Sequence, residues 1–152
     1  MRSFRAILPD QHEEYRGTKV SLWFLVALNV LVTVRSLIHM LAADGGANSI
    51  AGLDVDGAQG DNLISIFSTW GLSQLLLALA TWAVVARYRL LVPLMLTLNF
   101  FDWAGRLLVV AWKPLVAEDV APGEIGNYIF TPLCAIALWF ALPLEKSENA
   151  LP

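Results

Sequence analysis

Residues 75–85 read LLLALATWAVV, and Thr81 is the only polar side chain among them. A helix at the surface of a water-soluble bundle needs a polar stripe, and this stretch has none. It lies inside the apolar range 63–86. Three other ranges have similar length and composition, namely 20–43, 90–112 and 125–144. Because about 20 predominantly apolar residues cross a bilayer as a helix, the sequence predicts an all-α integral membrane four-helix bundle.

Composition supports this interpretation. Apolar residues make up 57% of the 152 residues, whereas soluble domains contain about 45–50%. Mean hydropathy is +0.62. A water-soluble helical bundle is the alternative. The length leaves room for one compact unit, so we expect a membrane domain over 20–144 with a segment 1–19 before it and a polar tail 145–152 after it.

The distribution of charge predicts the orientation. Basic residues gather at the two ends of the chain and between the second and third ranges, at Arg2, Arg5, Arg16, Lys19, Arg87, Arg89 and Lys146. The connections after the first and third ranges are acidic, with Asp44, Asp54, Asp56, Asp61, Glu118, Asp119 and Glu124. Lys and Arg near spans stay on the cytoplasmic side. We therefore expect a multi-pass protein with both termini cytoplasmic.

The connections between the ranges carry further expectations. Spans two and three are joined only by 87–89 and should be antiparallel neighbours. The first outer loop, 44–61, departs from the calcium-loop spacing of an EF-hand and reads as a solvated, turn-rich segment, although cation binding there is left open. Asp61 or Asn62 is the expected N-cap of span two. The first range is longer than a signal-peptide core, so we expect it to be retained.

Four ionisable residues inside the spans need an explanation: Arg35, His39, Asp102 and Arg106. A charge near the bilayer centre costs about 2.5–3.5 kcal/mol, so such residues usually face protein or water and pair. Helical rise puts Arg35 about 12 Å and Asp102 about 15 Å below the outer boundary. Because the two depths overlap, we expect Arg35 and Asp102 to form a central ion pair.

Other polar residues accompany these charges. Asn99 shares a helical stripe with Asp102 and Arg106, and Gln74 lies in the outer half of span two. Gly71, Ala78 and Gly105 are expected to allow close helix approach. We infer a polar pocket that opens outward. Its candidate binding residues are Arg35, His39, Gln74, Asn99, Asp102 and Arg106.

Simpler interpretations remain open. Arg106 and His39 are near enough to the surface to extend their polar ends into headgroup water. Asp102 can pair with Arg106 on its own helix. An enzyme using His39 and Asp102 for acid–base chemistry is another alternative, but no nucleophile motif accompanies them. No catalytic residue, cofactor or metal site is assigned, and Cys134 is expected to be a packing residue.

Three short motifs carry a family resemblance: Trp70-Gly71, Arg87-Tyr88-Arg89 and Gly105-Arg106. With the layout of four short helices, the chain resembles the DoxX-like group of small bacterial membrane proteins, over about 20–144. The resemblance implies an uncharacterised inner-membrane protein and supplies no catalytic residue.

The functional expectation is binding. The ligand would be a membrane lipid, a quinone or a small amphiphile whose anionic group is attracted to Arg35 and Arg106. The alternative is an accessory subunit that packs against other membrane subunits. No basic patch for nucleic acid is present.

Overall fold

The computed structural model describes residues 14–114 and 121–143, and within them it is all-helical. The elements are α1 (Lys19–Leu41), α2 (Gly57–Ala86), the 3-10 turn η2 (Arg89–Leu91), α3 (Val92–Trp112) and α4 (Pro122–Ala141). All four α-helices are long and apolar enough to cross a membrane. The predicted all-α architecture with four candidate spans is therefore confirmed. The segment 1–19 and the tail 145–152 lie largely or wholly outside the described residues.

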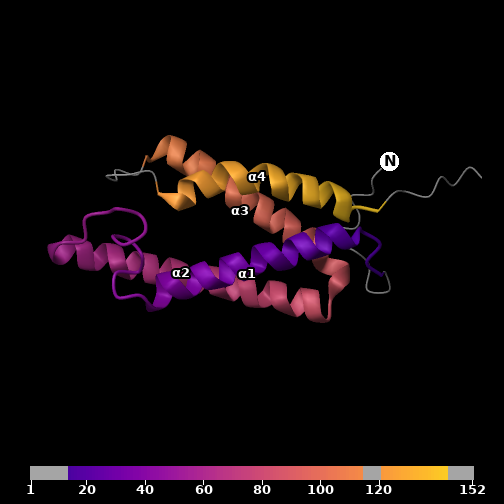
Figure 1. Cartoon of the computed structure of the whole chain (residues 1–152), viewed down its shortest axis with the longest axis horizontal. Coiled ribbons are helices and arrows are strands. Elements are labelled where there is room, and N and C mark those ends of the chain that lie inside the picture. The colour runs from indigo at the N-terminus through magenta and orange to yellow at the C-terminus, as the bar shows by residue number, and fades with distance from the viewer. Residues whose placement is uncertain (1–13, 115–120, 144–152) are drawn as a thin grey trace, which may run out of the picture.

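The four helices form two hairpins (Figure 1). Helix α1 packs mainly against α2, and α3 packs mainly against α4. The start of α1 meets the end of α4, where the Thr18 N–H donates to the carbonyl of Phe140 at 3.1 Å. Those two ends lie beside η2, and the connection 42–56 lies at the opposite end.

Helices α2 and α3 depart from the expectation that they pack as neighbours. They run antiparallel but diverge from their connection, near which Thr81 donates to the sulfur of Met95 at 3.6 Å. Further from the connection, the side chains of Trp70 on α2 and Trp103 on α3 lie on either side of two arginine groups. These bulky groups keep the two helices apart.

Close contact between α1 and α2 depends on a glycine. A Cβ added at Gly71 would lie 2.8 Å from the Cβ of His39 and 2.9 Å from the Ser36 carbonyl oxygen. The Asn29 amide also donates to the Ala78 carbonyl at 3.1 Å. Gly71 and Ala78 thus do allow close approach. The same expectation is wrong for Gly105, where an added Cβ would meet nothing within 4 Å.

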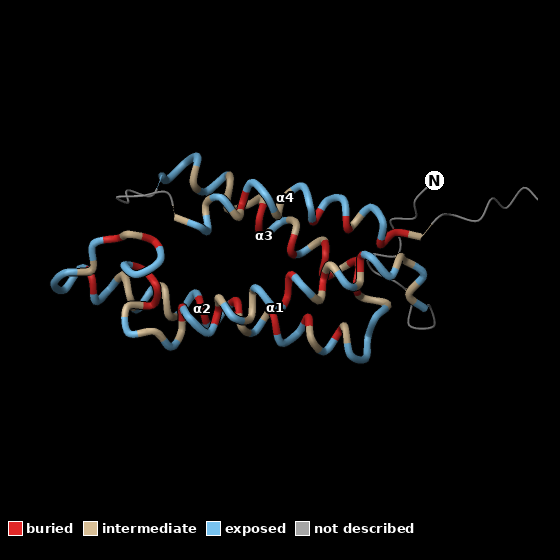
Figure 2. The backbone as a smooth tube through the Cα atoms, in the orientation of Figure 1, coloured by how far each residue is buried: buried red, intermediate tan, exposed pale blue. Residues whose placement is uncertain are grey.

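Buried residues face the interior of the hairpins, and the outer faces are exposed (Figure 2). The largest buried cluster lies near η2 and includes Leu25, Val84, Val92, Met95 and Leu96. Many large apolar side chains point outward, among them Val20 at 74% and Leu108 at 73% exposure. Such exposure is what helices surrounded by lipid show, since lipid tails are as apolar as leucine.

The bounds of helices α2 and α4 differ from the sequence expectation. Helix α2 begins at Gly57 after Asp56, so the N-cap is neither Asp61 nor Asn62. The reason is that Val55 folds against Gly60, where a Cβ would overlap the Val55 carbonyl. Helix α4 begins at Pro122 and ends at Ala141 instead of covering 125–144, and it continues through Pro132.

Candidate functional site

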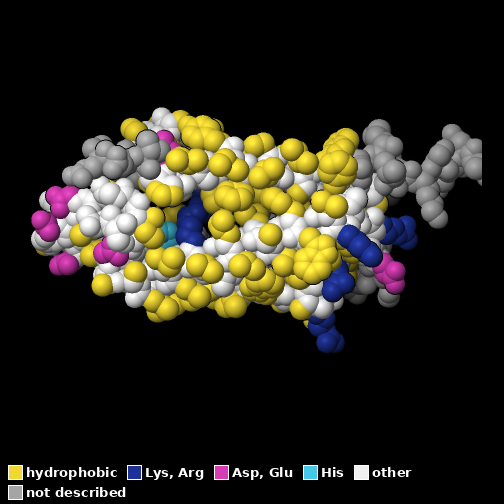
Figure 3. All heavy atoms as spheres, in the orientation of Figure 1, with side chains coloured by type: hydrophobic (Ala, Val, Ile, Leu, Met, Phe, Trp, Pro, Cys, Tyr) yellow, Lys and Arg dark blue, Asp and Glu magenta, His cyan; other side chains and the backbone are white. Residues whose placement is uncertain are grey.

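Five of the six predicted binding residues lie together between the two hairpins. Arg35 and His39 come from α1, Gln74 from α2, and Asp102 and Arg106 from α3. In the space-filling view, basic and histidine side chains occupy a recess in the mainly apolar middle of the face (Figure 3). The structure therefore brings five of the six residues into one cluster, and the outward-opening pocket stays a prediction.

The expected ion pair between Arg35 and Asp102 is wrong. Asp102 instead binds Arg106, with Oδ1 accepting from Nε at 3.3 Å and Oδ2 in contact with Nη2. This is the one ion pair among the residues that the structure describes. Residues four apart share a helix face, so Asp102 reaches Arg106 without any approach between helices.

Gln74 joins the two arginines. Its amide is oriented with the oxygen toward the surrounding donors, because this orientation satisfies both ends of the group. The oxygen then accepts from Nη2 of Arg106 at 3.1 Å, Nη2 of Arg35 at 3.2 Å and Nε1 of Trp70 at 2.8 Å. One neutral oxygen thus holds two cationic groups that come from different hairpins.

Two tryptophans enclose the arginines. The Cζ atom of Arg35 lies 4.8 Å from the ring centroid of Trp70 and 5.6 Å from that of Trp103. The corresponding distances for Arg106 are 5.2 Å and 4.7 Å. Tryptophan is the best aromatic partner for a cation in this range. Both guanidinium groups are therefore stabilised by two ring faces.

Sequence reasoning did not include these tryptophans among the site residues. A pattern that favours them is present, because Trp70 precedes Gln74 by one helical turn and Trp103 follows Asp102 directly. Both also lie well inside their spans, away from the membrane interface where tryptophan is common.

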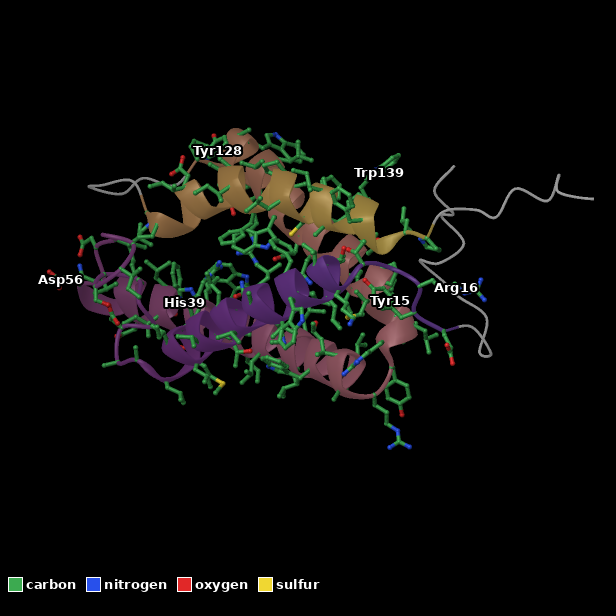
Figure 4. The ribbon with its side chains drawn as sticks, turned by 45° about the vertical axis from the view of Figure 1, so that its right-hand side comes forward. Tyr15, Arg16, His39, Asp56, Tyr128 and Trp139 are labelled. Carbon is green, nitrogen blue, oxygen red and sulfur yellow. The ribbon has the colours of Figure 1, made fainter. Side chains whose placement is uncertain are left out.

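Both ring nitrogens of His39, a residue of α1 (Figure 4), take part in hydrogen bonds. Nδ1 lies 2.7 Å from the carbonyl oxygen of Gly45, which can only accept, so Nδ1 carries the hydrogen. Nε2 then accepts from Nε of Arg35 at 3.3 Å. The imidazole is neutral in this arrangement. The acid–base partnership of His39 with Asp102, considered for an enzyme, is not formed, since Asp102 binds Arg106.

The cluster carries a surplus of positive charge. Arg35 and Arg106 each contribute a permanent cation, Asp102 contributes one carboxylate, and His39 is neutral. Arg35 is partly buried, and the side chain of Arg106 is only 17% exposed. Within the described residues, one positive charge is thus left without an opposite charge.

Two buried polar atoms in the described chain have no hydrogen-bond partner, Nε1 of Trp103 and Oδ1 of Asn127. Trp103 is 1% exposed and its ring is a wall of the arginine cluster. Asn127 lies on α4, outside the contacts that define the cluster. Buried polar atoms are normally paired, so the Trp103 indole needs an explanation.

The remaining predicted residues lie elsewhere. The Asn99 amide donates to the Met95 carbonyl on its own helix at 2.8 Å, so it does not join the cluster. Cys134 is fully buried with Leu28 and Trp103, which confirms it as a packing residue. Over 14–114 and 121–143, no group of three or more His, Cys, Asp or Glu side chains is arranged to hold a metal ion.

Comparison of the chain with the models of known protein families, with curated proteins and with solved structures gives no match. The resemblance to the DoxX-like group stays a prediction.

Proposed function

We propose that this chain is a multi-pass membrane protein that binds an amphiphile, with the anionic group of the ligand at Arg35 and Arg106. One observation carries the proposal: two guanidinium groups share the neutral oxygen of Gln74, while a single carboxylate, Asp102, compensates one of them. The ligand class expected from the sequence is a membrane lipid, a quinone or a small amphiphile.

The physical argument concerns the uncompensated charge. A charge within the hydrocarbon region costs about 2.5–3.5 kcal/mol on insertion scales. The stacking of Arg35 on Trp70 and Trp103 lowers that cost but does not cancel the charge. An anionic group beside Arg35 would cancel it. Arginine suits such a group because its planar fork matches carboxylate and phosphate oxygens.

We infer an orientation with both termini cytoplasmic. Arg16 lies at one end of the bundle and Asp56 at the other (Figure 4). Arg87 follows α2 and Arg89 begins η2, so both belong to the connection at the Arg16 end. The positive-inside rule puts the basic end in the cytoplasm. His39, which hydrogen-bonds the connection 42–56 through Gly45, then belongs to the outer half of the membrane. The DoxX-like resemblance favours a bacterial inner membrane. An accessory subunit and a membrane enzyme stay as alternative predictions.

The experiment uses native mass spectrometry to measure how much lipid co-purifies with the wild-type chain and with two variants. We expect the wild-type chain in mild detergent to retain a bound anionic amphiphile, and Arg35→Gln to lose most of it. Arg87→Gln is the matched control, because Arg87 is exposed in the connection before η2. Equal occupancy in all three proteins contradicts the proposal. Circular dichroism of Arg35→Gln shows whether the helices are intact.

A further inference from the structure

Resting on the proposed function, we propose that the ligand group is an oxyanion, a carboxylate or a phosphate ester on a hydrocarbon tail, and that Trp103 donates its indole N–H to it. Nε1 of Trp103 is buried and has no hydrogen-bond partner among the described residues. The same ring lies against Arg35 and Arg106. A ligand oxygen at this point explains both the charge and the unpaired indole.

The free donors of the arginines point to the same chemistry. Arginine has five N–H donors and no acceptor. Arg35 uses Nε on His39 and Nη2 on Gln74. Arg106 uses Nε and Nη2 on Asp102, and Nη2 also on Gln74. Nη1 of each arginine keeps both hydrogens without an acceptor among the described residues. The cluster therefore offers donors, and a ligand that complements it supplies acceptors.

Because the cluster has more hydrogen-bond donors than acceptors, it favours oxyanions over neutral amphiphiles. An ionised carboxylate is acceptor-only, and charge-assisted hydrogen bonds are roughly twice as strong as neutral ones. A quinone carbonyl accepts hydrogen bonds but leaves the positive charge of Arg35 uncompensated. An alcohol brings a further donor to a cluster that already has too many. Among the ligand classes open from the sequence, the geometry thus favours the anionic ones over quinones.

Trp103 differs from Trp70 because its indole N–H has no acceptor among the described residues. Nε1 of Trp70 already donates to the Gln74 oxygen at 2.8 Å. Trp70 therefore fixes the cluster, whereas Trp103 keeps its donor for another partner. Trp103 is also packed against α4, since an added Cβ at Gly126 would lie 3.4 Å from its ring. A ring held in this way presents its N–H at a fixed position.

The first experiment titrates four amphiphiles into the full chain in non-ionic detergent by calorimetry. The probes are oleate, dioleoyl phosphatidylglycerol, oleyl alcohol and a decyl-substituted quinone. We expect at least one oxyanion to bind about tenfold or more tightly than the two neutral probes. Preference for oleate identifies a carboxylate ligand, and preference for the phospholipid identifies a phosphate ester. Neutral probes that bind equally well overturn the inference, and with it the anionic group of the proposed ligand, but they leave the binding of an amphiphile intact. If no probe binds, the proposed function also fails.

The second experiment removes only the indole donor. Trp103→Phe keeps an aromatic ring beside both arginines and should weaken oxyanion binding about tenfold, the value of one hydrogen bond to a charged group. Trp112→Phe is the control on the same helix, because Trp112 is 84% exposed. Unchanged oxyanion affinity in a folded Trp103→Phe protein overturns the role of Trp103.

A measurement on the wild-type chain avoids any effect of the substitution on folding. The indole N–H resonance of Trp103 in a nitrogen-15 spectrum should move downfield when the preferred oxyanion is added, as a hydrogen bond forms. Assignment comes from the resonance that Trp103→Phe loses. Binding without any shift of that resonance also overturns the role of Trp103.

Discussion

Asp102 binds Arg106 through both carboxylate oxygens, four residues along the same helix. This relationship predicts which arginine depends on the carboxylate. Asp102→Asn should lower the free energy of unfolding by about 1–2 kcal/mol, between the values of exposed and buried pairs, because the Asp102 side chain is 38% exposed. Thermal unfolding in detergent measures the loss.

Double-mutant cycles show which arginine interacts with Asp102. We expect a coupling energy of roughly 0.5 kcal/mol or more between Asp102→Asn and Arg106→Gln. The cycle of Asp102→Asn with Arg35→Gln should give a smaller value, because Arg35 binds His39 and Gln74 instead. A larger coupling with Arg35 would show that the carboxylate belongs to the central pair expected from the sequence.

Gln74→Glu tests the surplus charge directly. The change places a carboxylate where one neutral oxygen now accepts from Arg35 and Arg106. Since hydrogen bonds to charged groups contribute about 1.5–3 kcal/mol, the variant should be more stable than the wild type by about 1 kcal/mol or more. The internal carboxylate should also weaken oleate binding at least about tenfold. Thermal unfolding and calorimetry on the same preparation measure both effects.

Gln74→Leu is the control for that experiment. It removes the shared oxygen without adding charge, so the stability of the protein should fall. A variant Gln74→Glu that binds oleate as tightly as the wild type would show that the positive charge of the cluster does not attract the ligand.

Helix packing predicts that alanine at two glycine positions has different effects on stability. An added Cβ at Gly71 would lie within 3.0 Å of two backbone atoms of α1, those of Ser36 and Met40. Gly71→Ala should therefore destabilise the protein by about 1–3 kcal/mol, the usual cost of overpacking. Gly105→Ala should be neutral or slightly stabilising, because the position is open and alanine is the better helix former. Equal losses of stability at both positions would contradict this assignment.

The sequence was sufficient for the architecture and for the grouping of charges. Apolar length alone predicts the four helices. Helical rise groups Arg35 with Asp102, and the structure places both side chains in one cluster. What depth does not provide is the rotation of each helix about its axis. That rotation decides whether Asp102 faces Arg35 on the other hairpin. In the structure Asp102 pairs with Arg106 on its own helix instead, and the Asn99 amide also bonds within its own helix.

The tryptophans show a second limit of prediction from the sequence. An aromatic residue in an apolar span is usually a lipid-facing or packing side chain. The spacing of Trp70 to Gln74 is compatible with a site residue, but it does not show that the ring contacts the arginines. Only the packing of α1 onto α2 at Gly71 brings the Trp70 ring over Arg35. Similarly, helix α2 extends beyond the predicted bilayer boundary because Val55 folds against Gly60, a contact that periodicity does not contain.

The connection 42–56 offers a test that is independent of the ligand. The Asp44 carboxylate accepts from the backbone N–H of Ser49 at 2.7 Å and of Gly46 at 2.9 Å. These hydrogen bonds lower the pKa of Asp44 from 3.8 to about 2. A carboxyl whose pKa is lower in the folded state stabilises that state above the unfolded pKa, and the contribution is lost as pH falls through the folded pKa.

Protection of the Gly46 and Ser49 amides against hydrogen exchange should therefore be constant from neutral pH down to about 4. It should decrease between about 4 and 2, after correction for intrinsic exchange rates. In Asp44→Asn the amide group cannot ionise, so protection should be lower at neutral pH and should not change over that acid range. A decrease that begins near neutral pH would assign the transition to another group, because Asp44 is fully ionised there.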